Sequence, residues 1–185
     1  MGEGWFPPPL FVSLGMEETI KVMNKLEYIS ESDSIIGWSD STIAQSESND
    51  CVVRAIAAAT GSCYDVAHKY VAEVFNRKPK QGTVLTSRKL KEQTEILGKK
   101  IVELGEPCKT FPNNPYRLIT RYKNWGEIVE RQMTLKTFVK LNPIGTYILI
   151  VARHAFALKD GKVVGGNCKD ARELKKRVHS AFMLK

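Results

Sequence analysis

The chain has 185 residues, of which 43% are hydrophobic and 26% are charged, a composition that is typical of a globular protein and favours one domain. No apolar run is long enough to span a membrane, so the composition excludes a membrane-spanning chain. The net charge of +8 comes from residues 76–140 and 159–185, since residues 1–50 are acidic. A basic surface attracts nucleic acid or acidic partners, and it is also common as a plain solvated face.

Apolar spacing and helix-ending residues predict helices through the first half of the chain. Gly61 and Gly98 are each placed to end one of these helices. Residues 30–50 are rich in Ser and Asp and are predicted to form a loop. The predicted helices cover residues 17–29, 51–60, 64–75 and 87–97, and Ser62 is the predicted cap of the third.

Strands dominate the predicted second half. Continuous apolar runs are typical of strands covered on both faces, and Asp160-Gly161 predicts a two-residue hairpin. Thr134 can cap a helix that reaches about Leu141, while residues 116–131 show no clear pattern. The predicted strands cover residues 99–104, 147–151, 154–158, 163–167 and 178–184.

Helices followed by strands indicate an α+β fold. We expect residues 1–16 to be an ill-ordered extension and residues 17–185 to form a single domain. The apolar N-terminus lacks a basic lead and is a poor secretion signal.

Cysteine usage indicates reduced thiols. The spacing of the cysteines is irregular and contains no Cys-x-x-Cys, which favours neither a zinc site nor a set of disulfides. We therefore expect no metal, no cofactor and a cytoplasmic location. The four cysteines are Cys51, Cys63, Cys108 and Cys168.

Cys51 stands at the start of the predicted helix 51–60. Asp50 or Asn49 can cap this helix, which places Cys51 in the first turn, where unpaired backbone N–H groups and the helix dipole favour an anion. A thiolate is such an anion, so the position suits an activated nucleophile. The other interpretation is that Cys51 is a small core residue.

His154 begins a predicted strand, and the hairpin centred on Asp160-Gly161 places Asn167 opposite it. Opposed side chains lie roughly 5 Å apart at Cβ. An Asn carbonyl that accepts from one imidazole nitrogen leaves the other nitrogen to take a proton from Cys51, as in acyl-transfer enzymes. A bulge at Gly165-Gly166 would break this register, and a histidine that merely packs on the sheet is the alternative.

Three segments carry a family resemblance: Asn-Asp-Cys-Val-Val-Arg-Ala-Ile-Ala-Ala-Ala-Thr-Gly (49–61), Asn-Pro-Ile-Gly-Thr-Tyr (142–147) and His-Ala-Phe-Ala-Leu (154–158). Together, over residues 40–185, they resemble the papain-like cysteine peptidase superfamily, and most of all its small members from bacterial and phage genomes. The resemblance implies N-terminal helices and a central nucleophile helix packed on a C-terminal antiparallel sheet. It also implies Cys51 as nucleophile, His154 as general base and Asn167 as the residue that orients the base.

Papain-like enzymes also carry a Gln six residues before the nucleophile, and Gln45 stands at that distance from Cys51. The Gln amide helps to bind the oxyanion, beside the backbone N–H of the nucleophile. Asn49 is the next candidate for this role. Val-Val-Arg follows the cysteine where the well-known peptidases have Gly, Ser and an aromatic residue, so deamidation or amide transfer by the same residues stays open.

The residues and the resemblance together predict a cysteine-dependent hydrolase that acts on an amide bond of a peptide or protein. The alternative is a non-catalytic papain-fold protein that binds nucleic acid or a host protein through its basic surface. We expect no membrane partner, and the location would be the host cytoplasm if the protein is phage-encoded.

Overall fold

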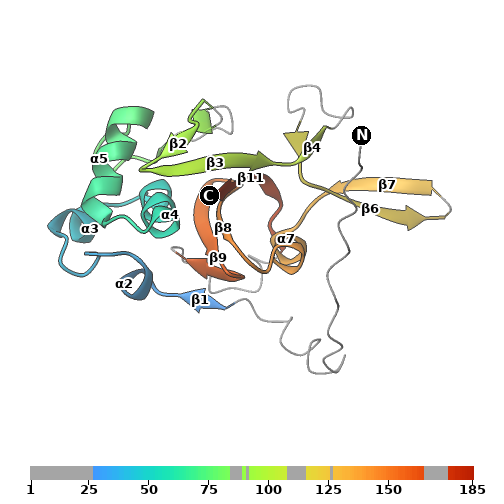
Figure 1. Cartoon of the computed structure of the whole chain (residues 1–185), viewed down its shortest axis with the longest axis horizontal. Helices are drawn as coiled ribbons and strands as arrows, with labels where there is room; N and C mark the ends of the chain where they lie inside the picture. The colour runs from blue at the N-terminus through green and yellow to red at the C-terminus, as the bar shows by residue number, and fades with distance from the viewer. Residues whose placement is uncertain (1–26, 84–88, 91, 108–115, 126, 165–174) are drawn as a thin grey trace, which may run out of the picture.

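Most of the described strands lie in the second half of the chain, after the first four of the described helices. The computed structural model describes residues 27–83, 89–90, 92–107, 116–125, 127–164 and 175–185 (Figure 1). The helices are α2 (Glu31–Ser34), α3 (Thr42–Ser46), α4 (Cys51–Thr60), α5 (Tyr64–Phe75) and α7 (Leu135–Leu141). The strands are β1 (Tyr28–Ile29), β2 (Glu95–Ile96), β3 (Lys99–Leu104), β4 (Glu106–Pro107), β5 (Tyr116–Arg117), β6 (Ile119–Asn124), β7 (Glu127–Gln132), β8 (Thr146–Val151), β9 (His154–Lys159), β10 (Lys162–Val164) and β11 (Val178–Leu184).

One seven-stranded sheet, in the order β1-β10-β9-β8-β11-β3-β2, forms the centre of the molecule. Helices α4 and α5 lie on one side of this sheet and α7 lies on the other (Figure 1). The sheet is mixed, because β1 pairs with β10 in parallel while the other neighbours are antiparallel. The expectation of a purely antiparallel, C-terminal sheet was therefore wrong in detail, although the chain does combine helices with a sheet as an α+β protein does.

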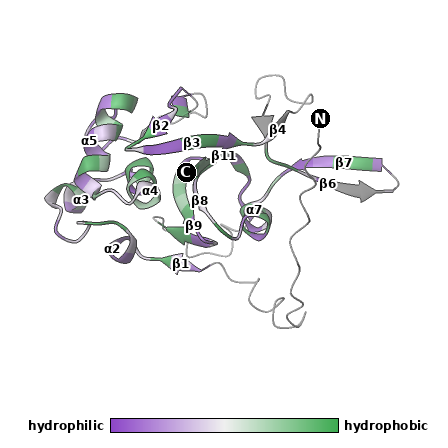
Figure 2. Cartoon of the chain, viewed as in Figure 1, coloured by the Kyte–Doolittle hydropathy of each residue, from purple (hydrophilic) through white to green (hydrophobic). Residues whose placement is uncertain are grey.

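The central strands bury both of their faces. Along β8, Ile148 belongs to the core shared with α4 and α5, whereas Tyr147 and Leu149 belong to the core shared with α7. This alternation explains why the sequence of β8 is continuously apolar: each successive side chain meets a hydrophobic neighbour. Figure 2 shows the hydrophobic residues concentrated in α4 and in the central strands. Within the described ranges, no helix has both the length and the apolar character needed to cross a membrane.

Helix α4 is the buried centre of the helical layer and packs against β9, β8 and α5. Seven of its ten residues are buried, and four of those are alanines. Small side chains let the helix approach its neighbours closely, and a helix that is apolar on nearly all sides is typical of an interior position. Gly61 ends α4 in a left-handed conformation, with φ 71° and its N–H donated to the Ala57 carbonyl, as the sequence predicted.

Several predicted elements were confirmed at or near their bounds. Helices α4 and α5, the helix α7 with Thr134 as its cap, and strands β3, β9 and β11 all lie where the sequence placed them. Cys63, not Ser62, occupies the N-cap of α5 and makes no capping hydrogen bond.

Three predictions near the helical layer were wrong. The last two residues of the predicted helix 17–29, Tyr28 and Ile29, instead form strand β1, which pairs with Val163 and Val164. Residues 1–26, which include the predicted extension 1–16, lie outside the described residues. The predicted loop 30–50 contains the short helices α2 and α3, which Ser30 and Ser41 cap. Within the predicted helix 87–97, Glu95 and Ile96 instead form strand β2, which pairs with β3.

The packing of α4 yields a stability prediction. Ala57 is fully buried, so Ala57→Leu should overpack the core and lower the free energy of unfolding by about 1–3 kcal/mol. Urea denaturation measures the change. Ala72→Leu, at a half-exposed site on α5, is the control and should shift stability by less than about 0.5 kcal/mol. Equal effects of the two substitutions would contradict the close packing described for α4.

Candidate functional site

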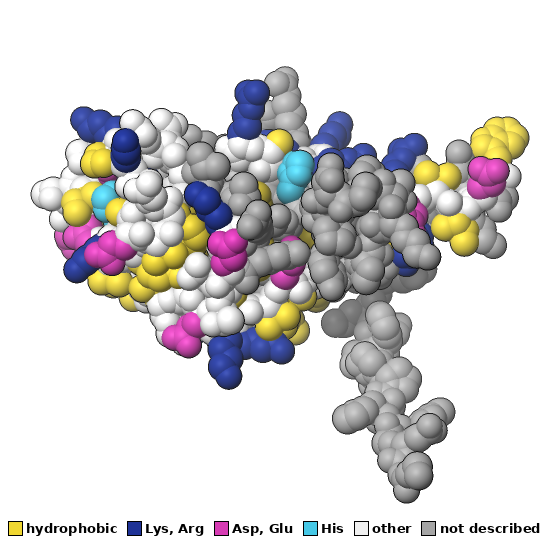
Figure 3. Space-filling view, turned by 90° about the horizontal axis from the view of Figure 1, so that it is seen from above, with side chains coloured by type: hydrophobic (Ala, Val, Ile, Leu, Met, Phe, Trp, Pro, Cys, Tyr) yellow, Lys and Arg dark blue, Asp and Glu magenta, His cyan; other side chains and the backbone are white. Residues whose placement is uncertain are grey.

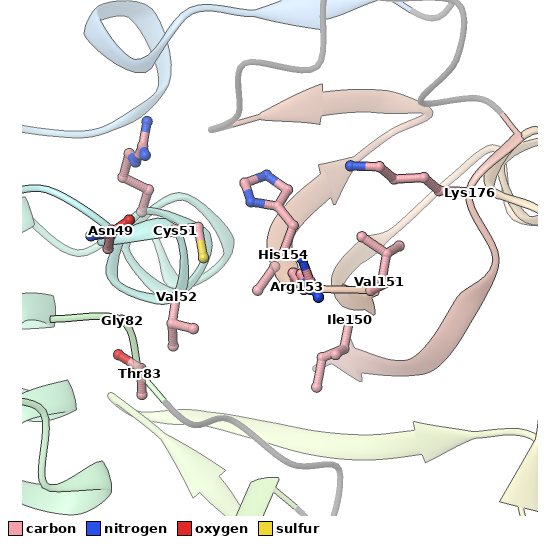
Figure 4. A pocket seen from close by; sticks show the side chains of 13 residues that line it. Asn49, Cys51, Val52, Gly82, Thr83, Ile150, Val151, Arg153, His154 and Lys176 are labelled. Atoms are coloured by element: carbon pink, nitrogen blue, oxygen red, sulfur yellow. The ribbon is translucent and has the colours of Figure 1, made fainter.

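A cavity of about 880 Å³ opens where the N-terminus of α4 faces the turn between β8 and β9. Cys51 and His154 both line this cavity, although they are far apart in the sequence. Figure 4 shows the Cys51 side chain at the α4 wall and the His154 imidazole at the wall formed by β9. The structure therefore brings the predicted nucleophile and the predicted base to one cavity.

Cys51 is the first residue of α4 and is half-buried. Asp50 occupies the N-cap, as predicted, but its side chain makes no capping hydrogen bond. The first backbone bond of the helix runs from the Arg54 N–H to the Asp50 carbonyl. The N–H groups of the first turn thus have no acceptor within the helix and no side-chain cap, which leaves them available to stabilise an anion beside the Cys51 sulfur.

The Asp50 carboxylate is held away from the helix amides by two other groups. Arg54 Nη2 lies 2.9 Å from Asp50 Oδ1, and the Tyr64 hydroxyl donates to Asp50 Oδ2 at 2.7 Å. Burial raises the pKa of Tyr64 well above its ordinary value, and the hydrogen bond to Asp50 raises it further. The phenol therefore stays protonated and remains a donor to Asp50.

Arg54 also lines the cavity, but acidic groups compensate its charge. Its Nη1 donates to Glu31 at 3.0 Å, and its Nη2 pairs with Asp50. The guanidinium also lies over the Trp38 ring, 5.8 Å from the centroid. These contacts fix the position of the Arg54 side chain at the cavity wall.

His154 begins β9 directly after a two-residue turn and pairs across that turn with Val151. The imidazole is half-buried, and its ring centroid lies 6.0 Å from that of Phe156. Its Nε2 atom is buried. Phe156 belongs to the core shared with α7, so this ring contact holds His154 at the start of β9.

The predicted partner of His154, Asn167, lies outside the described residues. The hairpin register used to place it holds as far as the structure describes β10: Val163 opposes Leu158 and Val164 opposes Ala157. The register is confirmed to that point.

Gln45 is exposed on α3, and the described residues that line the cavity do not include it. Asn49, the second candidate for the oxyanion role, does line the cavity. Asn49 has a positive φ of 56°, a conformation that Asn tolerates better than most residues. The structure therefore brings Asn49, and not Gln45, to the cavity that holds Cys51.

A buried ionic cluster fixes the segment that leads to Cys51. Arg77, whose side chain is 0% exposed, donates to Glu47 Oε2 at 2.7 Å and to the Ser48 carbonyl at 3.2 Å. Arg77 Nη1 lies 3.0 Å from His68 Nε2, which must accept because a guanidinium has only donors. The Lys80 N–H adds a hydrogen bond to Glu47 at 2.8 Å.

This cluster ties the loop after α5 to the loop before α4. The hydrogen bond from Arg77, helped by the one from the Lys80 N–H, lowers the pKa of Glu47 to about 2 although burial opposes the change. Sequence reasoning missed the cluster because its members lie in three separate segments. The polar segment before Cys51 gave no pattern that pointed to them.

The wall opposite α4 carries two further cations, Arg153 and Lys176. Sequence reasoning missed both as cavity residues. Arg153 could have been suspected, because it directly precedes His154; Lys176 stood in a basic run that gave no sign of its place. No described residue that lines the cavity is an Asp or a Glu.

Basic side chains elsewhere are dispersed. Figure 3 shows Lys and Arg spread over one face of the molecule, with acidic side chains between them. Trp125 and Ile128, on the β6–β7 hairpin, are 98% and 68% exposed. In the described part of the chain, no three His, Cys, Asp or Glu side chains are grouped to hold a metal ion.

The Glu47 cluster predicts a pH dependence of stability. The pKa of Glu47 is about 2 in the folded protein and has an ordinary value of 4.5, so the ionised carboxylate stabilises the fold above pH 4.5 and this contribution is lost as the pH falls towards 2. Glu47→Gln should lower the free energy of unfolding by about 3 kcal/mol at neutral pH. The difference from wild type should shrink through the acidic range.

Urea denaturation of both proteins between neutral pH and pH 2 measures this difference. Glu73→Gln is the control, since Glu73 makes only an exposed contact with Lys69 at 4.0 Å. That substitution should change stability by less than about 0.5 kcal/mol. A difference between wild type and Glu47→Gln that does not change with pH would contradict the role given to Glu47.

Comparisons of the chain with protein-family models, with curated proteins and with solved structures found no match. The interpretation of the site therefore depends on its own geometry and chemistry.

Proposed function

We propose that the protein is a cysteine-dependent hydrolase that cleaves an amide bond of a peptide or protein, with Cys51 as nucleophile and His154 as general base. One observation carries the proposal: the thiol and the imidazole line the same cavity, at the uncapped N-terminus of a buried helix. Nucleophile and base in reach of one bound carbonyl, next to oriented N–H groups, are the parts that acyl transfer requires.

The proposed reaction proceeds in two steps. His154 takes the proton of the Cys51 thiol, and the thiolate attacks the amide carbon. His154 then gives that proton to the leaving nitrogen as the C–N bond breaks and a thioester forms. Water, which gives a proton to His154, attacks the thioester and releases the acid; the proton returns to Cys51. An amine in place of water would give amide transfer with the same residues.

Two donors are proposed for the oxyanion: the backbone N–H of Cys51 and the side-chain amide of Asn49. The first belongs to the open first turn of α4, and the second belongs to a residue of the cavity wall. Donors of this kind act most strongly where charge develops in the transition state. Gln45, the choice implied by the resemblance to papain-like enzymes, is the competing candidate.

The proposal also includes a papain-like fold and Asn167 as the residue that orients His154. The papain-like fold is supported by the chain order, in which the helix with Cys51 comes before the strand with His154. The role of Asn167 is supported by the β9–β10 register: Val164 opposes Ala157, and the same register extended by three residues would pair Asn167 with His154.

Alkylation of Cys51 tests the activated nucleophile. At slightly acidic pH, iodoacetamide should modify Cys51 at least about tenfold faster than Cys63, which is also half-buried and also at a helix N-terminus, because only Cys51 shares its cavity with His154, the proposed acceptor of its proton. His154→Ala should remove most of this advantage. Mass spectrometry of each cysteine-containing peptide gives the rates.

His179→Ala is the matched control, because His179 is exposed on β11 and does not line the cavity. Equal modification of Cys51 and Cys63 would contradict the proposal. Salt-dependent binding of DNA or RNA that survives Cys51→Ala, together with such equal modification, would favour the alternative of a binding protein.

A pair of glycine substitutions tests the oxyanion donor. Asn49→Gly removes the amide but keeps a residue that tolerates the positive φ, so kcat for a cleaved fluorogenic peptide amide should fall by about 10² to 10³. Asn76→Gly, at another positive φ of 52° outside the cavity, should leave kcat near wild type. If Gln45→Ala lowers kcat and Asn49→Gly does not, the assignment to Asn49 is wrong.

A further inference from the structure

The segment that follows Lys80 forms part of the cavity wall, because Gly82 and Thr83 both line the cavity. A Cβ atom added to Gly82 would lie 4.0 Å from the Asn49 Cβ, so the segment packs against the residue proposed as the oxyanion donor. Just before it, the Lys80 N–H donates to Glu47 at 2.8 Å. These contacts hold Thr83 at the cavity through its main chain.

The Thr83 hydroxyl has an unusual environment. The residue is half-buried, its Oγ1 atom is buried, and no described residue forms a hydrogen bond with that atom. A buried hydroxyl without a partner costs free energy, because it loses water and gains nothing in exchange. A role in binding or catalysis is one explanation for such a group. Figure 4 favours that explanation, since it shows Thr83 near Gly82 on the α4 side of the cavity, across from His154.

Few side chains of the cavity can accept a hydrogen bond from a peptide. A peptide brings carbonyl groups, which need donors, and N–H groups, which need acceptors. The described lining residues include three Lys or Arg, which only donate, and no Asp or Glu. Among them, only Asn49 and Thr83 carry a side-chain oxygen. The Asn49 amide is assigned to the oxyanion, which leaves the Thr83 oxygen as the acceptor for a peptide N–H.

Rotation about a single bond brings the Thr83 hydroxyl to the cavity. The hydroxyl and the methyl group share one Cβ atom, and their staggered positions differ by about 120° about χ1. The hydroxyl breaks no hydrogen bond to a described residue when it exchanges places with the methyl group. A bound peptide N–H would then supply the partner that the hydroxyl does not have within the described chain.

We propose that Thr83 is a substrate-binding residue, whose Oγ1 atom accepts a hydrogen bond from a main-chain N–H of the peptide next to the scissile amide; this rests on the hydrolase function proposed above. The bond would hold the peptide main chain against the wall formed by Gly82 and Thr83, while the scissile carbonyl meets Cys51 and Asn49. Positioning of this kind raises the rate of attack. Because the contact is with the main chain, it binds peptides without selecting one side chain.

An isosteric substitution tests the hydroxyl. Thr83→Val replaces it with a methyl group, so kcat/KM for a cleaved fluorogenic peptide amide should fall by about 3- to 10-fold, the value of one neutral hydrogen bond. Thr83→Ser, which keeps the hydroxyl, should recover most of that loss. Thr120→Val, at a half-buried position on β6 outside the cavity, is the matched control and should leave kcat/KM unchanged. An unchanged kcat/KM in Thr83→Val would overturn the assignment.

Two further measurements show whether Thr83→Val acts through the fold. Exchange of an unpartnered buried hydroxyl for a methyl group is neutral or stabilising, so the midpoint of urea denaturation should stay at or above the wild-type value. The rate of Cys51 alkylation by iodoacetamide should stay within about twofold of wild type, because the nucleophile is untouched. A lower urea midpoint would show that the hydroxyl has a partner inside the protein and would overturn the proposal.

Ester-containing peptides identify the N–H that Thr83 binds. An ester in place of one amide next to the scissile amide removes one N–H, and release of the fluorophore still reports cleavage of the scissile amide. At one position the ester should lower kcat/KM of the wild type by about 3- to 10-fold and that of Thr83→Val by less than about twofold. Equal losses in the two proteins at every position would contradict the hydrogen bond.

The outcomes separate this proposal from the hydrolase proposal. If Cys51 outpaces Cys63 with iodoacetamide and peptide amides are cleaved, but Thr83→Val cleaves them as fast as wild type, the role of Thr83 is wrong and the hydrolase proposal stands. If Cys51 has no advantage with iodoacetamide, the hydrolase proposal itself fails, and the role of Thr83 fails with it.

Discussion

The contact between α4 and strand β9 determines that Cys51 and His154 line the same cavity. Alanines fill much of the buried surface of α4, so the helix lies close to the sheet, and its first residue comes to the end of the strand that His154 begins. Neither side chain would be positioned by local structure alone. The cavity is a consequence of how one buried helix is packed against one strand.

The proposed site also depends on the first turn of α4 having no side-chain cap. Asp50 has the residue type and the place of an ordinary N-cap, yet Arg54 and Tyr64 hold its carboxylate elsewhere. A capped first turn would use up N–H groups that could otherwise face a thiolate or an oxyanion. The Glu47–Arg77 cluster completes this arrangement, since it fixes the chain just before the cap. Burial of these charges is stabilising only because each carboxylate has several partners.

Sequence patterns predicted the parts of the fold that are set by local periodicity. Helix α4, its Gly61 end and the β9–β10 register were all predicted, because apolar spacing, a left-handed glycine and an Asp-Gly turn act over a few residues. The patterns failed where long-range pairing decided the structure. Tyr28 is a strand residue only because β10 offers it an edge, and the β6–β7 hairpin showed no clear pattern because one strand carries charged residues at both faces.

The candidate site was predicted in the same uneven way. Cys51 and His154 are rare residue types at the start of strongly patterned elements, so they could be selected from the sequence. Arg153 and Lys176 are common residue types, and only the tertiary fold places Lys176 in the cavity that Arg153 and His154 also line. From the sequence, Gln45 was preferred to Asn49 as the oxyanion donor. The positive φ of Asn49, which turns the chain before α4, cannot be predicted from a periodic pattern of residues.

Two cavity residues, Arg153 and Lys176, differ from the proposed pair Cys51 and His154 in how they are held. Arg153 is exposed in a short turn and Lys176 sits on a connecting segment, and neither belongs to the two hydrophobic cores of the protein. Either residue can therefore be exchanged during evolution with little penalty to folding. Homologues could therefore differ in the charge of this cavity wall while α4, β9 and the packing between them are inherited unchanged.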